Sequence, residues 1–419
     1  MVYYSPPFPL VLDYGPRILK TWTAEDELGV LLASQHLPRV TEIVLSAPEL
    51  TLAKLTTGMT EAAPRLKTLV LHTQTSEIVL PKQFLEGGAP QLRHLILTGA
   101  ALSPLQPLLM SATSLVSLVL ERIPSSAYFS SDSLVTLIRV MPLLQILSIS
   151  FLSTVPRPGF RGERVLFPGQ VTRIELPSLT QLIYRGVSAY IEALLSRIRS
   201  PHMEDVDIAL FNQLTLDVPR TWEFIRELES FRPTRARIDF AEASVHIILS
   251  APQSTALPDV FLSVSCVRLD FQVAATAQLC GGLSATLQPP VEELVLGCHQ
   301  GGRALPEEWR GEVDPGLWRE LLAPFRRVGT LRVHVALAAD IERALRPGPA
   351  DLQLGGQLLP ELRELVLLHG SDENALKSAS AALSAFADER NDAGHPVKVH
   401  SQDLSRLVES ETGELIITY

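Results

Sequence analysis

The sequence predicts an α/β solenoid, in which short strands lie side by side and a returning segment follows each strand. Similar stretches recur at residues 63–71, 89–97 and 359–367, with a proline two residues ahead of Leu66, Leu92 and Leu362 respectively. Each stretch contains the pattern L-x-x-L-x-L, the strand signature of a leucine-rich repeat. One such unit cannot bury its own apolar face, so we expect a leucine-rich-repeat horseshoe with parallel strands on its concave face.

About twelve irregular units can be aligned on the first apolar position of this pattern. The best matches begin at Val40, Leu66, Leu92, Leu115, Leu144, Leu179, Val291 and Leu362. Weaker matches begin at Met203, Val264 and Val328, and the poorest begins at Arg235. The longer steps between units exceed the period of about 20–29 residues that is typical of this architecture, which indicates insertions in the returning segments.

Helices are predicted in several returning segments. One covers residues 134–140 after a serine-rich start, one runs from Ser188 to Arg199, and one covers 317–322. The third has the carboxylate of Asp314 as its cap and Pro315 in its first turn. The longest covers residues 375–389. We expect the prolines ahead of the units to end each helix and to lead into the next strand in an extended conformation.

The repeat boundaries suggest three regions. Residues 1–36 form an N-terminal strand and helix cap, residues 37–395 the solenoid, and residues 396–419 a C-terminal cap that includes the apolar stretch 415–419. Caps are needed because a solenoid exposes apolar edges at its ends. Segments rich in proline and glycine at 153–169, 297–315 and 346–356 are predicted to be loops.

Composition excludes several classes of function. The net charge is −10, and a negative chain is a poor candidate for binding nucleic acid or anionic membrane, so neither is an expected partner. No apolar run is long enough to span a bilayer, and the first residues do not resemble a signal peptide. Three cysteines cannot form a disulfide framework. We therefore expect a cytoplasmic or nuclear protein.

A strip of charged residues is predicted on the concave face of the middle units. Its members alternate in sign and stand between the leucines: Arg185, Asp205, Asp207, Arg237, Asp239, Arg268, Asp270 and Glu293. Strands lie about 4.8 Å apart, so opposite charges of neighbouring units can pair laterally. Two interpretations stay open. The strip is either a surface that satisfies its own charges or a recognition site for a charged segment of a protein partner.

The known catalytic and cofactor motifs do not occur in this sequence. There is no H-E-x-x-H motif, no G-x-x-x-x-G-K-[ST] phosphate loop and no G-x-S-x-G nucleophile motif. Cys266, Cys280, Cys298 and His299 lack the paired spacing of a zinc site. The sequence thus indicates no catalytic residue, no cofactor and no metal site, and a binding role is the expectation.

The chain resembles the leucine-rich-repeat region of fungal, mushroom-type F-box-like proteins. The resemblance lies in residues 36–48, which look like their first repeat, in residues 89–97 and in residues 171–182. It implies substrate recognition for a cullin-RING ubiquitin ligase. The apolar L-P-x-E-I pattern of an F-box does not occur ahead of the first repeat, so binding of the Skp adaptor would require an F-box outside residues 1–419.

The expected function is therefore a non-enzymatic protein–protein interaction module. The resemblance favours the substrate-recognition part of an F-box-type ubiquitin ligase. The alternatives are an intracellular repeat scaffold unrelated to ubiquitin, and a GTPase regulator that would use an exposed arginine.

Overall fold

The computed structural model describes residues 8–15, 22–73, 78–101, 107–152, 173–228, 231–251, 259–283, 290–298, 307–346, 358–370 and 373–404. The chain divides into two compact units. Unit 1 comprises Met1–Phe211 and Glu227–Glu229, and unit 2 comprises Asn212–Arg226 and Ser230–Tyr419. The predicted loop 153–169, residues 299–306 of the loop 297–315, residues 347–356 of the loop 346–356, and the stretch 415–419 lie outside the described residues. In the described part of the loop 297–315, Glu307–Arg310 form a short helix.

Unit 1 contains a parallel sheet whose strands follow one another in sequence order. Its strands are β1 (Leu10–Tyr14), β2 (Val40–Ser46), β3 (Thr68–His72), β5 (His94–Thr98), β7 (Ser117–Ile123), β8 (Ile146–Phe151), β10 (Gln181–Gly186) and β12 (Asp205–Leu210). Leu69, Leu95 and Leu118 are partners across β3, β5 and β7, and all three are fully buried. Stacked parallel strands with a shared leucine spine confirm the leucine-rich-repeat solenoid.

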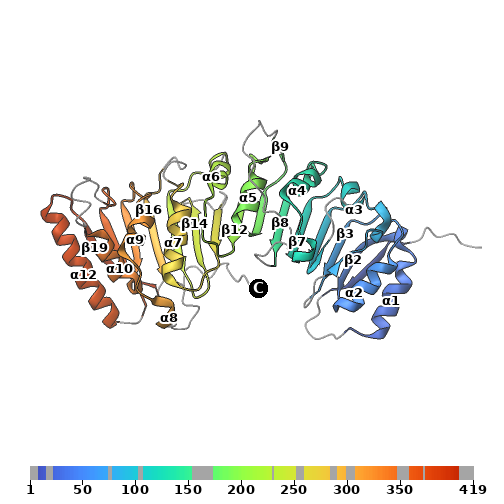
Figure 1. Ribbon diagram of the computed structural model, residues 1–419, viewed down its shortest axis with the longest axis horizontal. Helices are drawn as coiled ribbons and strands as arrows, with labels where there is room; N and C mark the ends of the chain where they lie inside the picture. Colours follow the sequence, from blue (N-terminus) through green and yellow to red (C-terminus); the bar gives the residue numbers. More distant parts are fainter. Residues whose placement is uncertain are drawn as a thin grey trace, which may run out of the picture. The chain divides into compact units, whose positions relative to one another are not determined.

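The returning segments of unit 1 cover the leucine face of this sheet (Figure 1). They comprise α1 (Ala24–Ser34), η1 (Leu37–Arg39), α2 (Glu49–Gly58), η2 (Phe84–Gly87), α3 (Pro107–Ser111), η3 (Ser125–Ala127), α4 (Ser131–Ile138) and α5 (Ser188–Leu195). Two pairs of short parallel strands lie among them, β4 (Ile78–Val79) with β6 (Ala100–Ala101) and β9 (Ile174–Glu175) with β11 (Ile198–Arg199).

A β-turn leads into many strands, and the repeated proline lies inside it. The amide of Leu66 donates to the carbonyl of Ala63 at 3.0 Å, and Leu92 donates to Ala89 at the same distance. Pro64 and Pro90 thus occupy the second position of the turn, where the fixed φ of proline is favourable. The expectation of an extended conformation at these prolines was therefore wrong.

Most predicted helices are present, with shifted ends. Helix α4 is capped by Ser130, whose hydroxyl accepts from the amide of Ser133 at 3.2 Å. Helix α5 stops at Leu195 because Ile198 and Arg199 form β11 instead. In unit 2, the Asp314 carboxylate caps α9 (Pro315–Leu322) through the amide of Gly316, as predicted.

Unit 2 begins its sheet with an antiparallel part and continues it in parallel. The strand order is β15 (Asp259–Val264), β14 (Val245–Ser250), β13 (Arg235–Phe240), β16 (Glu293–Cys298), β17 (Thr330–His334), β18 (Glu364–His369) and β19 (Lys398–Asp403). The pairs β13–β14 and β14–β15 are antiparallel, and the pairs from β13–β16 onward are parallel. Its other elements are α6 (Pro219–Arg226), α7 (Leu269–Cys280), α8 (Glu307–Arg310), α9, η4 (Val335–Leu337), α10 (Ala338–Leu345) and α12 (Glu373–Asp392).

The predicted repeat unit at Val264 does not exist. Val264 is the last residue of β15, which runs antiparallel to β14, and Leu269 begins helix α7. Val267, which was expected in the apolar core of a unit, is 65% exposed. Each of the other predicted units supplies a strand to the 15-stranded sheet, so among the described residues the predicted repeat fails at Val264.

Candidate binding surface

Each sheet has one face turned away from the buried leucines, which we call the open face. Alternate side chains of a strand point to opposite faces, so the residues between the leucines lie on this face. Arg185, Asp205 and Asp207 lie on the open face of unit 1, and Arg237, Asp239 and Glu293 lie on that of unit 2.

Two of the predicted strip residues are elsewhere. Arg268 is the N-cap residue of α7, and Asp270 lies in its first turn. The guanidinium of Arg268 donates to both carboxylate oxygens of Asp270, at 3.1 and 2.7 Å, and lies over the Phe271 ring. They form a local pair at the beginning of a helix, so the prediction that they belong to the strip was wrong.

In unit 1 the three strip residues do not pair with one another. The Asp205 carboxylate accepts a hydrogen bond at 2.8 Å from the side-chain amide of Gln181 on the neighbouring strand. Asp207 lies across from Ile183 on that strand. Burial, and then the negative charge of Asp205, raise the pKa of Asp207 to about 6. Arg185 is exposed, and no residue in the described part of the chain forms a hydrogen bond or ion pair with it.

In unit 2 the charged residues of the strip form hydrogen bonds and ion pairs. The Nε of Arg237 donates to Asp239 Oδ2 at 2.6 Å within β13, and Asp239 is only 8% exposed. Glu293 Oε1 accepts from Arg332 Nε of β17 at 2.5 Å and lies 3.6 Å from Arg235 NH2 of β13. Lateral pairing between neighbouring strands thus occurs here, but Glu293 pairs with Arg332 and Arg235 and not with another residue of the predicted strip.

Arg332 extends this network to the last described strand. Its NH1 donates to the Gln402 side chain of β19 at 2.5 Å, so one arginine links three strands of the sheet. Beside it lies a small apolar cluster of Val295, Val366 and Leu368. Arg332 was not among the residues predicted for the strip, although it stands between Leu331 and Val333 in the same alternating position as those residues.

Burial shifts two further titratable groups at this end of the unit 2 sheet. It lowers the pKa of His334, and the negative charge of Asp239 partly opposes this shift. It raises the pKa of the Cys298 thiol to about 12, partly opposed by the positive charge of Arg310, while Asp239 adds to the rise. The Cys298 thiol is therefore protonated, and a poor nucleophile, near neutral pH.

Comparison with known proteins assigns this chain to no family. No family model matches this chain, and neither does any curated protein. One similar solved structure is the leucine-rich repeat-containing protein LegL7 from Legionella pneumophila, with 11% identity and a TM-score of 0.27, covering 74% of this chain and 90% of that chain. Another is an internalin, InlF, from Listeria monocytogenes, with 13% identity and a TM-score of 0.28, covering 93% of both chains. The fold assignment stands on this chain's own strands and leucines.

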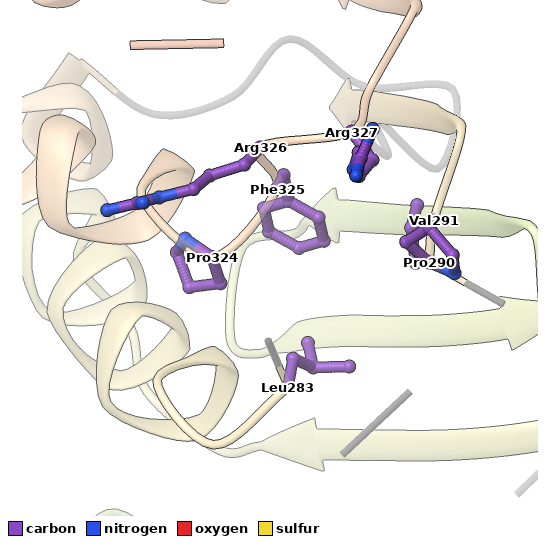
Figure 2. Close-up of a pocket in the computed structure, with 7 residues that line it drawn as sticks. All are labelled: Leu283, Pro290, Val291, Pro324, Phe325, Arg326 and Arg327. Carbon is purple, nitrogen blue, oxygen red and sulfur yellow. The ribbon is translucent and has the colours of Figure 1, made fainter. Parts of the chain in front are cut away.

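One cavity of about 140 Å³ lies in unit 2, where the chain turns into β16 and β17 (Figure 2). It is lined by Leu283, Pro290, Val291, Pro324, Phe325, Arg326 and Arg327. Arg327 donates to Glu361 at 2.5 Å, and Arg326 extends away from Pro290 and Val291. The lining is mostly apolar and brings no carboxylate, histidine or thiol together, so it offers no catalytic set.

No group of three His, Cys, Asp or Glu side chains in the described ranges could hold a metal ion. None of the helices in the described part is both long and apolar enough to cross a membrane.

Proposed function

We propose that this chain is a non-enzymatic protein–protein interaction module that binds its partner on the open face. The observation that carries the proposal is the open face of unit 1, where eight parallel strands present alternate side chains as one wide surface. Arg185 stands on that surface, exposed and without an ion pair in the described part. Arginine is enriched among the residues that dominate binding energy at protein interfaces.

The finer proposal is substrate recognition for an F-box-type cullin-RING ubiquitin ligase in the cytoplasm or nucleus. Its support is the resemblance of residues 36–48, 89–97 and 171–182 to the repeat region of fungal F-box-like proteins. The three cysteines are free, and Cys266 and Cys280 are buried, which suits a reducing compartment.

Affinity capture with the full chain tests the first proposal. Proteins that bind the wild type are identified by mass spectrometry and then tested with Arg185→Glu. We expect the charge reversal to reduce capture of the partner at least fivefold. The matched control is Arg65→Glu, an exposed arginine in the turn before β3, which should leave capture within twofold. Equal capture by all three proteins would refute binding through this face.

The same capture tests the ubiquitin proposal separately. We expect the Skp adaptor and a cullin among the proteins that co-purify with the endogenous protein from its own cells. If a partner depends on Arg185 but neither ubiquitin-ligase subunit is present, the chain is an interaction module without this role.

A further inference from the structure

An apolar line crosses the open face of unit 1. Val44, Val70, Ile96 and Val119 are direct partners across β2, β3, β5 and β7. The line continues over the small, buried Ser148 of β8 to Ile183 of β10. We call the five aliphatic residues the ladder. All five are half-buried, because each side chain is covered by its lateral neighbours and remains open to solvent above.

From this ladder we infer that the partner docks an amphipathic helix with an apolar stripe and basic flanks across the strands of unit 1. The inference deepens the proposed function and rests on it, because it names the chemistry of the partner. Two independent observations support it: the spacing of the ladder, and the charge around it.

The spacing favours a helix over an extended peptide. Neighbouring strands are about 4.8 Å apart, so the ladder offers one aliphatic side chain per 4.8 Å from β2 to β7, skips β8 at Ser148, and is about 24 Å long in all. A helix presents one side chain to a surface about every 5.4 Å, which is one turn. Residues on one face of an extended peptide are about 6.7 Å apart and fall out of step with the ladder. About 16 helical residues would span its length.

The charge favours a basic partner. The charged residues of the strands that surround the ladder on the open face are Asp13, Glu42, Glu121, Arg185, Asp205 and Asp207. Five of these six are carboxylates, and Arg122, in the irregular end of β7 beside Glu121, adds one further positive charge. Lys67 and Arg93 are exposed just ahead of β3 and β5, at the edge of this face. Lysine or arginine residues beside the apolar stripe of a helix would therefore meet mostly acidic groups, and a carboxylate where the helix crosses β10 would meet Arg185. Such complementary charges steer association and set orientation.

Model peptides test the inference on the full chain. The first probe is an 18-residue helical peptide with leucines along one face and lysines on both flanks. The second replaces every lysine by glutamate, and the third has the leucine and lysine residues in scrambled order. By fluorescence anisotropy we expect the first peptide to bind at least tenfold more tightly than either of the others. Equal binding by the acidic or the scrambled peptide, or no binding by the first, would overturn the inference.

Variants locate the binding. The double variant Val70→Thr, Val119→Thr keeps the β-branched shape but adds two hydroxyl groups to the ladder, and should weaken binding of the basic peptide at least tenfold. Ile248→Thr is the matched control, a half-buried aliphatic residue on the open face of unit 2, and should change binding less than twofold. Glu42→Gln with Glu121→Gln should weaken binding and reduce its salt dependence.

Amide hydrogen exchange on the wild type keeps the test decisive if a variant fails to fold. The peptide should protect amides of β3, β5 and β7, and protection confined to unit 2 would contradict the inference.

The peptide and capture experiments together separate the two proposals. If no peptide binds while Arg185→Glu abolishes capture of a partner, the ladder inference fails and the proposed function stands. If Arg185→Glu also has no effect, both fail.

Discussion

The carboxylate of Asp239 on β13 lies against the backbone of Gly297 on the neighbouring strand β16. A Cβ atom at position 297 would come within 2.1 Å of Asp239 Oδ1, which is closer than two non-bonded atoms can approach. The other carboxylate oxygen accepts from Arg237 at 2.6 Å. The position of the Arg237–Asp239 pair therefore depends on the absence of a side chain on the next strand.

We predict that Gly297→Ala destabilises unit 2 by about 1–3 kcal/mol, because the added methyl group must displace a buried carboxylate or the strand. Urea unfolding followed by tryptophan fluorescence measures the change, since Trp222, Trp309 and Trp318 all lie in unit 2. The control is Gly329→Ala, whose Cβ would meet its nearest atom at an ordinary 3.9 Å. An unchanged midpoint for Gly297→Ala would contradict the packing described.

The leucine spine gives a second prediction. Leu95→Ala removes a fully buried side chain between Leu69 and Leu118 and should destabilise unit 1 by about 2–5 kcal/mol. Leu143→Ala removes a side chain that is 51% exposed, and should cost less than about 0.5 kcal/mol. Circular dichroism during urea unfolding compares the two. Similar losses for both variants would count against a solenoid core at Leu95.

The raised pKa of Asp207 predicts a pH-dependent stability. Burial and Asp205 hold the pKa at about 6 in the folded chain, above its ordinary value of 3.8. Between these values the folded state binds more protons than the unfolded state, so this group lowers stability as pH rises from about 4 to 6. We expect Asp207→Asn to gain stability relative to wild type over this range, by about 1–3 kcal/mol above pH 6.

Unfolding midpoints of both proteins at several pH values between 4 and 7.5 measure this difference. Asp217→Asn, at an exposed position in unit 2, is the control and should follow the wild type throughout. A constant difference between Asp207→Asn and wild type at every pH would show that Asp207 does not titrate in this range.

The cysteines give a prediction about reactivity. Burial raises the pKa of Cys266 to about 11 and that of Cys298 to about 12, and it also raises the pKa of Cys280. The reactive thiolate is therefore scarce at pH 7.5. We expect mass spectrometry to show almost no alkylation of the native chain by iodoacetamide and complete alkylation of all three thiols in urea. Rapid labelling of one native cysteine would reveal a reactive site that this structure does not contain.

The repeated leucines made the solenoid predictable, because a regular apolar period is a local signal. The L-x-x-L-x-L stretches at Leu66, Leu92 and Leu362 each give a buried strand. The antiparallel segment was missed because its turn between β13 and β14, residues 241–244, contains neither glycine nor proline. The spacing of Val264, Val267 and Leu269 imitates a repeat, but a helix begins there.

The candidate surface was only partly predictable. Strand alternation placed Arg185, Asp207 and Glu293 on the open face correctly. Which charged residues form hydrogen bonds or ion pairs depends on contacts between strands that are far apart in sequence. The hydrogen bond from Arg332 to Gln402 is one such contact. The ladder could not be predicted, because its aliphatic residues come from different repeats. They line up only through the register of six strands.

The antiparallel segment has a consequence for how the chain assembles. In unit 1 each strand joins one that was formed a short distance earlier in the chain, so contacts can spread step by step. In unit 2, β13 must pair with β16 across residues 241–292, which include two strands and helix α7. Closing so long a loop carries a larger entropic cost before its contacts form. This junction is where we expect the slowest step of folding to lie.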